Sequence, residues 1–211
     1  MNAHPRHALA RPVSRTRFRV LALTVATLLS VAGFAAPAQA ASLGPSTINY
    51  SRTVDLSGKS GQVRGSGGLT YAETLQKKVT ANNLARATTT CNGCKATAIA
   101  FEVVVASGAP TDLTANNTAL ALNTKCSRCS STALAYQFVV SNDRWTFMTV
   151  SGRIKLSLIN VKLAALAKSG ASPETMQAKA DDYAAQVRSI LAQDLRTFPT
   201  FRRAFKHVDL G

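Results

Sequence analysis

The sequence predicts an α+β domain in which an antiparallel sheet, built from two duplicated CxxC β-hairpins, packs against two C-terminal amphipathic helices. Three observations favour this fold. One stretch of the chain consists of two similar copies, and in each copy large and small side chains alternate as in a β-strand. Nearer the C-terminus, apolar residues recur with helical spacing. We expect a single domain over residues 69–195, with repeats at 81–107 and 115–142.

The duplication is defined by an asparagine pair, a cysteine pair and the segment that follows them. The period is 34 residues at the asparagines and 35 at the cysteines, as expected when one residue is gained or lost in a loop of a repeated unit. The matching segments are Ala81-Asn82-Asn83 with Ala115-Asn116-Asn117, Cys91-x-x-Cys94 with Cys126-x-x-Cys129, and 97–105 with 132–140.

Each cysteine pair is followed by residues with the two-residue period of a strand. Ile99, Phe101 and Val103 share one face, and smaller residues occupy the other. Residues 84–90 and 118–124 suit strands before the cysteines. The pair then marks a hairpin turn, and Asn92-Gly93 is a typical two-residue turn, whereas Ser127-Arg128 leaves the turn type of the second copy open.

Two helices are expected after the repeats. Ser172 is a good N-cap before Pro173, and apolar residues then recur at three- and four-residue spacing as far as Leu195. A second helix is expected over residues 154–168, ended by Ser169-Gly170. We expect both helices to cover the face of the sheet with the large side chains.

The repeated pattern resembles a group of small secreted bacterial proteins of actinobacterial type with duplicated CxxC repeats. The resemblance rests on Asn-Asn-x-Ala, CxxC and Thr-Ala-Leu-Ala-Tyr-Gln-Phe-Val-Val, followed by a charged helical tail, and covers about residues 80–195. It implies an exported protein and the repeat boundaries, and it implies no activity.

The N-terminus is typical of a secretory signal peptide. Five arginines and no acid lie in the first 19 residues, an uncharged apolar run covers residues 20–36, and Ala38-Gln39-Ala40 suits a signal peptidase. We expect residues 1–40 to be removed by the general secretory or the twin-arginine route, with no transmembrane segment afterwards. Residues 41–68 are rich in Ser and Gly and are expected to form a flexible arm.

The four cysteines allow several kinds of chemistry. In an oxidising compartment Cys91, Cys94, Cys126 and Cys129 are expected to form disulfides, either within each pair or between the repeats. The alternative cofactor is zinc held by all four thiolates. A redox-active CxxC would need a helix N-terminus, whereas strand-forming residues follow here.

The sequence offers little to a catalytic mechanism. After removal of residues 1–40 the only histidine is His207, and neither HExxH nor GxSxG occurs. Glu102 is the only acid within the repeated segments, and we interpret it as a solvated strand residue because Gln137 replaces it in the second copy. We therefore expect no catalytic residues and no enzyme.

Charge points to a partner class. Residues 1–40 contain five arginines and no acid, so their removal leaves 20 Lys plus Arg against 10 Asp plus Glu, a formal charge of +10. Arg202, Arg203 and Lys206 lie among phenylalanines in a basic aromatic tail, residues 196–211. Either the phenylalanines of this tail pack on the domain and leave its charges solvated, or the tail binds polyanions. The second interpretation predicts an anionic cell-wall polymer or lipid surface as partner and no specific nucleic acid.

These observations predict a secreted, non-catalytic structural or surface-binding protein with weak adhesion to anionic surfaces. The first alternative is an extracellular zinc-binding domain that uses the four cysteines. The second alternative is an enzyme of unrecognised type.

Overall fold

The computed structural model describes residues 46–198. The expected signal peptide and the basic residues Arg202, Arg203 and Lys206 lie outside this range. The described elements are β1 (Ser46–Leu56), β2 (Val63–Thr74), β3 (Lys78–Thr89), β4 (Lys95–Ala106), β5 (Asp112–Asn123), β6 (Ser130–Ser141), β7 (Thr146–Met148), α1 (Val150–Lys168), α2 (Pro173–Asp194) and β8 (Leu195–Thr197).

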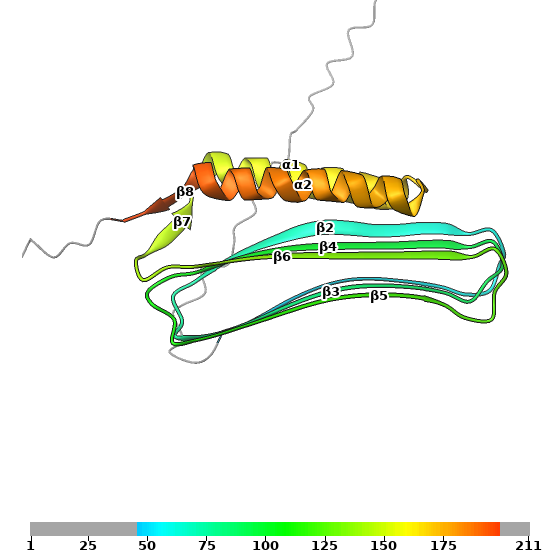
Figure 1. The fold of residues 1–211 in the computed structure, drawn as a ribbon, viewed down its shortest axis with the longest axis horizontal. Helices are drawn as coiled ribbons and strands as arrows, with labels where there is room; N and C mark the ends of the chain where they lie inside the picture. The colour runs from blue at the N-terminus through cyan, green and yellow to red at the C-terminus, as the bar shows by residue number, and fades with distance from the viewer. Residues whose placement is uncertain (1–45, 199–211) are drawn as a thin grey trace, which may run out of the picture. The chain divides into compact units, whose positions relative to one another are not determined.

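The six long strands form two parallel three-stranded sheets, not the predicted antiparallel sheet. Sheet A has the order β1-β3-β5 and sheet B the order β2-β4-β6 (Figure 1). The strands before and after each cysteine pair lie in different sheets, so the expected hairpins are arches. We call each arch a rung: β1 with β2, β3 with β4, and β5 with β6. Each strand pairs with its equivalent in the next rung, as Asn82 pairs with Asn116 and Phe101 with Tyr136.

The turns explain why the rungs stack instead of folding as hairpins. Gly93 has a φ of 66°, as a tight turn requires, but its N–H donates to the carbonyl of Ser127 in the next rung at 2.8 Å. In the same way the N–H of Gly61 donates to the carbonyl of Asn92 at 2.9 Å. The Asn-Gly signal correctly predicts a turn. The hydrogen bonds of that turn, however, run between successive rungs.

The small residues of the strands lie between the two sheets. The interior contains rows of alanines, among them Ala85, Ala87, Ala98 and Ala100. Val54 and Leu56 of the first rung pack against these alanines. Small side chains allow two sheets to pack closely over their whole length. An arch with an alanine interior therefore buries both strands without any pairing between them.

Residues 46–68, expected as a flexible arm, instead form β1 and the first half of β2, which belong to the first rung. Asn49 continues the asparagine row through its pairing with Asn82. This rung has no cysteine pair, and glycines stand where the other rungs have larger residues. A Cβ at Gly65 or Gly67 would overlap the backbone of α1, so these glycines permit close packing of a helix.

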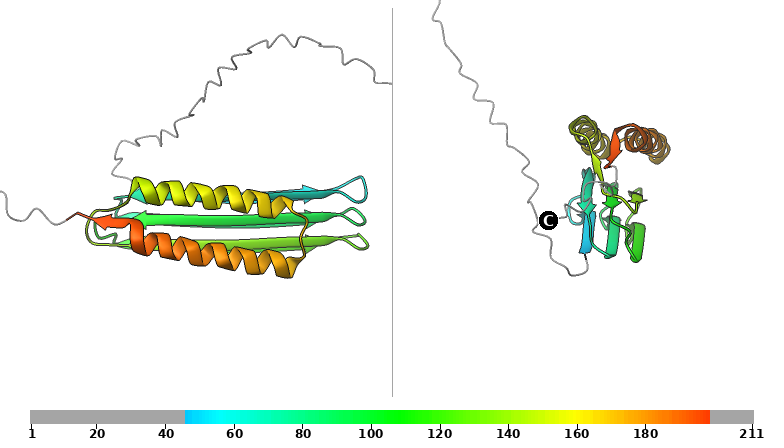
Figure 2. Two further views of the ribbon diagram at one scale, coloured as in Figure 1. Left: turned by 90° about the horizontal axis from the view of Figure 1, so that it is seen from above. Right: turned by 90° about the vertical axis from the view of Figure 1, so that its left-hand side faces the viewer.

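The helices cover the other face of sheet B, as expected from the large side chains there. Ile99, Phe101 and Val103 pack with apolar residues of both helices, including Leu163 of α1 and Val187 of α2. Figure 2 shows α1 and α2 side by side over this sheet. Ser172 accepts from the N–H of Thr175, as an N-cap should. Antiparallel pairing is confined to β7 and β8 within the described residues.

Candidate functional site

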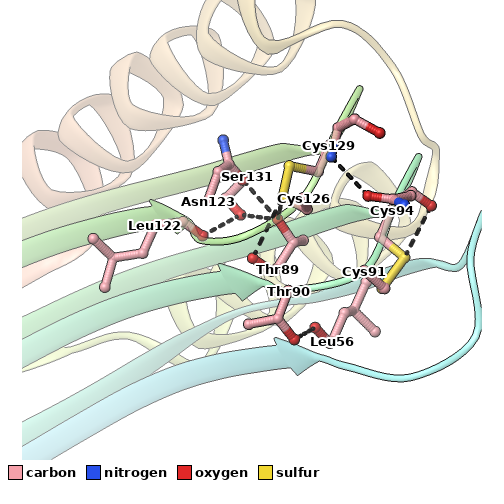
Figure 3. Close-up of a disulfide and its surroundings, with 12 residues drawn as sticks. Leu56, Thr89, Thr90, Cys91, Cys94, Leu122, Asn123, Cys126, Cys129 and Ser131 are labelled. Carbon is pink, nitrogen blue, oxygen red and sulfur yellow. Dashed lines mark hydrogen bonds between the residues drawn. A yellow bond between two sulfur atoms is a disulfide. The ribbon is translucent and has the colours of Figure 1, made fainter.

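The cysteine pairs form disulfides inside the turns that connect the two sheets at one end of the strands. Cys91 and Cys94 form the second-rung disulfide, with 5.6 Å between their Cα atoms, and Cys126 and Cys129 form the third-rung disulfide, at 6.0 Å (Figure 3). The second-rung disulfide is buried and the third-rung disulfide is partly exposed. Within residues 46–198 no cluster of three or more His, Cys, Asp or Glu side chains is arranged to hold a metal.

Asparagine side chains form two rows along the stack. On the outer face of sheet A, the Asn116 amide donates to Asn82 at 2.8 Å, and the Asn82 amide donates to Asn49 at 2.7 Å. Between the sheets, the Asn83 amide donates to the carbonyl of Ala100 and to the side-chain oxygen of Asn117. These amides link one rung to the next, so their role is to hold the rungs together.

Glu102 departs from the sequence-based expectation. Its side chain lies between the sheets with 0% exposure, so the interpretation as a solvated residue is wrong. The side-chain amide of Gln137 donates to one carboxyl oxygen at 2.6 Å, while the other has no hydrogen-bond partner among the described residues. Burial raises the pKa of Glu102, and the hydrogen bond from Gln137 opposes that shift. The residue is enclosed, and no described pocket reaches it.

The outer surface of α1 carries a feature that the sequence analysis missed. Val150, Ile154, Leu158 and Val161 lie on the side of α1 opposite to its buried residues and are 58–75% exposed. We call these four residues the α1 stripe. Their spacing of four, four and three residues is a helical signal of its own, but a helix with apolar residues on both faces resembles an ordinary buried helix in sequence.

Basic side chains border the α1 stripe. α1 contains Arg153, Lys155, Lys162 and Lys168 and no acidic residue. Arg153 pairs with Glu73 at 3.1 Å and Lys155 with Asp194 at 2.7 Å. The Lys155 ammonium lowers the pKa of Asp194. Lys162 and Lys168 form no ion pair with any residue of the described range, so their charges remain available to an anionic partner.

A shallow groove of about 280 Å³ runs between the helices beside the α1 stripe. Lys155 and Lys162 line it from α1, and Gln186, Ser189 and Gln193 line it from α2. The groove offers amide, hydroxyl and ammonium groups beside the apolar side chains Leu158, Ile159 and Ile190, and it contains no nucleophile paired with a base. Its chemistry suits weak binding of an anionic group rather than catalysis.

Three aromatic rings cluster where α1 begins. Trp145 stacks on Phe198 with 4.6 Å between the ring centroids, and Phe147 stacks on the same ring at 4.9 Å. Trp145 is 52% exposed and is the only tryptophan of the chain. Exposed tryptophans with one apolar and one polar side are enriched where proteins meet membrane interfaces.

None of the described helices is both long enough and apolar enough to cross a membrane. No family model, curated protein or solved structure matches this chain. The geometry of the described residues is therefore the basis for the functional proposal.

Proposed function

We propose that this chain is a secreted, non-catalytic protein that binds weakly to an anionic lipid surface through the outer face of α1. The stack of three rungs serves as a rigid base for the helices. Export is supported by the signal-like N-terminus and is compatible with the two disulfides. The observation that carries the proposal is the α1 stripe, because a soluble helix gains nothing from four aliphatic residues facing water.

A lipid surface suits this stripe better than a cell-wall polymer does. Helices that lie in a membrane interface combine an apolar face with basic residues on its borders, which α1 does with the α1 stripe, Lys162 and Lys168. A charged polysaccharide would attract the lysines but would give the aliphatic side chains nothing to contact. The net charge of +10 without residues 1–40 adds long-range attraction to anionic headgroups.

The expected affinity is modest. Full burial of a Leu, Ile or Val side chain contributes about 1.5–3 kcal/mol, so a side chain that is a little over half exposed contributes about 1 kcal/mol on insertion. Four such residues and two lysines without an ion pair give binding that is reversible and sensitive to salt. The screening length falls from about 10 Å at 0.1 M salt to about 3 Å at 1 M.

The test is co-sedimentation of the protein with phosphatidylglycerol vesicles and with phosphatidylcholine vesicles. Replacing both Ile154 and Leu158 by Gln should remove about 2 kcal/mol and weaken binding to anionic vesicles about thirtyfold. The matched control replaces Leu120 and Leu122 by Gln, since these residues are also exposed but lie on the outer face of sheet A, which the helices do not cover. The control should bind as the wild type does.

Other outcomes would contradict the proposal. No binding to anionic vesicles at low salt would refute it directly. Undiminished binding by the Ile154 and Leu158 variant would show that the stripe is not the contact. If only the triple replacement of Arg202, Arg203 and Lys206 by Ser abolished binding, adhesion would belong to the tail.

A further inference from the structure

We propose that two copies of this chain associate through the free edge of the third rung, with β5 of each copy pairing antiparallel with β6 of the other. Within the described residues β5 has β3 as its only strand neighbour and β6 has only β4. Each strand therefore has one side that no other strand pairs with. This association is independent of the proposed lipid contact.

The backbone groups on this edge point away from the protein in a regular order. The N–H of Thr124 donates to the carbonyl of Thr89 at 3.0 Å, and the N–H of Ser130 donates to the carbonyl of Cys94 at 2.9 Å. Because successive N–H groups of a strand point to opposite sides, even-numbered residues bond within the stack. Odd-numbered residues of β5 and β6 then direct their N–H and C=O groups to the free edge, where the carbonyl of Ala135 already accepts from the side-chain amide of Asn117 at 2.9 Å.

The same odd-numbered residues direct their side chains to the interior between the sheets. On β5 these include Ala119 and Ala121, which pair in register with the buried Ala85 and Ala87 of β3. On β6 they include Ala133, which pairs with the buried Ala98 of β4. An antiparallel pair between β5 and β6 of two copies thus satisfies the hydrogen bonds and continues the alanine interior without a change of face.

Neither strand has the usual protection of a free edge. Natural proteins place lysines, prolines or bulges on exposed edge strands to prevent pairing. β5 and β6 contain no Lys, Arg or Pro, and Asp112, at the start of β5, is their only charged residue. Leu120 and Leu122 add exposed apolar side chains on the outer face of β5. An uncharged edge is electrostatically compatible with a second copy of itself.

At the opposite edge of the stack α1 covers β2, while β1 has no strand beyond it among the described residues, so the two edges differ and a dimer is favoured over a filament. On β2 the N–H of Leu69 donates to the side-chain oxygen of Asn160 from α1 at 2.8 Å, and α1 packs directly on Gly65 and Gly67. Stacking β2 of one copy on β6 of another would have to displace this helix. Only the third-rung edge is free in both sheets, so the contact joins two identical edges.

The helices decide how the two edges meet. α2 lies along the β6 side of the stack (Figure 2), and a helix of about 10 Å diameter is wider than the strand spacing of about 4.8 Å. A twofold axis perpendicular to the sheets would press the two α2 helices together. A twofold axis parallel to the strands instead places the two helix layers on opposite faces of the dimer. This axis exchanges sheets A and B, so it brings β5 of one copy beside β6 of the other. The pairing is antiparallel because the two strands of one rung run in opposite directions.

The experiment is the oligomeric mass of the purified protein by analytical ultracentrifugation over a range of concentrations. Ala119→Pro removes one edge N–H and places a ring on the free edge, while the bonds to β3 are kept. The wild type should show a dimer, and the variant should have a dissociation constant raised about tenfold or more. Thr53→Pro is the matched control, because Thr53 points its N–H to the free side of β1, and it should leave the dimer intact.

A second variant guards against misfolding of the proline variant. Leu120→Lys with Leu122→Lys adds two charges to exposed positions outside the interior, and it should also give a monomer with unchanged circular dichroism. A monomeric wild type at high concentration would overturn the proposal. Open-ended polymers that Thr53→Pro also blocks would overturn it in favour of head-to-tail stacking.

Discussion

Replacement of Glu102 by Gln should stabilise the protein at neutral pH. Glu102 and Gln137 occupy the same row between the sheets, and Thr70 of β2 continues that row. The carboxyl group is fully buried, receives one hydrogen bond from Gln137 and leaves its second oxygen unpaired. Glutamine has the same shape without the charge, so the substitution removes the electrostatic cost and creates no cavity.

The magnitude follows from the buried charge, because glutamine at this position would also leave one polar atom without a hydrogen bond. A buried hydrogen-bonding group without a partner costs about 1–3 kcal/mol, and more when it is charged. We therefore expect Glu102→Gln to raise the free energy of unfolding at pH 7 by about 1–3 kcal/mol. The inner amides Asn83 and Asn117 show that this interior accepts neutral amide rows, since they bond to each other at 2.8 Å.

The pH dependence provides the more specific test. Burial raises the pKa of Glu102, so the folded state holds the proton to a higher pH than the unfolded state does. The protonated Glu102 side chain therefore contributes its full share to the free energy of unfolding below the ordinary carboxyl pKa. This contribution is lost as the pH rises through the raised pKa of Glu102. Asp194 and Asp181 have lowered pKa values and act in the opposite direction, at lower pH. The difference between wild type and variant isolates Glu102.

The assay is urea unfolding from pH 4 to pH 8, followed by circular dichroism. The stability difference between variant and wild type should grow as the pH rises and then become constant. The matched control is Asp112→Asn, which changes a carboxyl group that is exposed instead of buried. If the Glu102 variant kept the wild-type profile, or were less stable at pH 7, the argument from burial would be refuted.

Three further changes test other parts of the stack. Gly65→Ala places a methyl group against the carbonyl of Ala167 and should lower stability by about 1–3 kcal/mol in thermal unfolding, or more if α1 cannot move. Asn83→Ala removes a donor that serves three acceptors and should cost about 1–3 kcal/mol, whereas Asn82→Ala on the exposed face should cost less than 1 kcal/mol. Under mild reduction followed by alkylation, peptide mass mapping should find label at the third-rung disulfide before the buried second-rung disulfide. Equal labelling of both would contradict the assigned burial.

Local patterns in the sequence predicted the strands of the second and third rungs and the two helices. Alternation at Ile99, Phe101 and Val103 correctly predicts a strand whose large side chains meet the helices, because a strand has the same period wherever its partner lies. Ser172 and Pro173 begin α2 as predicted, since a helix cap depends on residues within a few positions. The cysteine spacing likewise located both turns.

The partners of the strands were decided only by the tertiary structure. A hairpin and an arch use similar turns and the same alternation, so Asn92-Gly93 alone does not reveal whether β3 pairs with β4 or with β5. The first rung was missed because Gly65 and Gly67 fit a helix that lies about 100 residues away in sequence. The burial of Glu102 depends on the distance between two sheets. Such properties arise from contacts between distant segments, and these contacts leave no periodic signal along the chain.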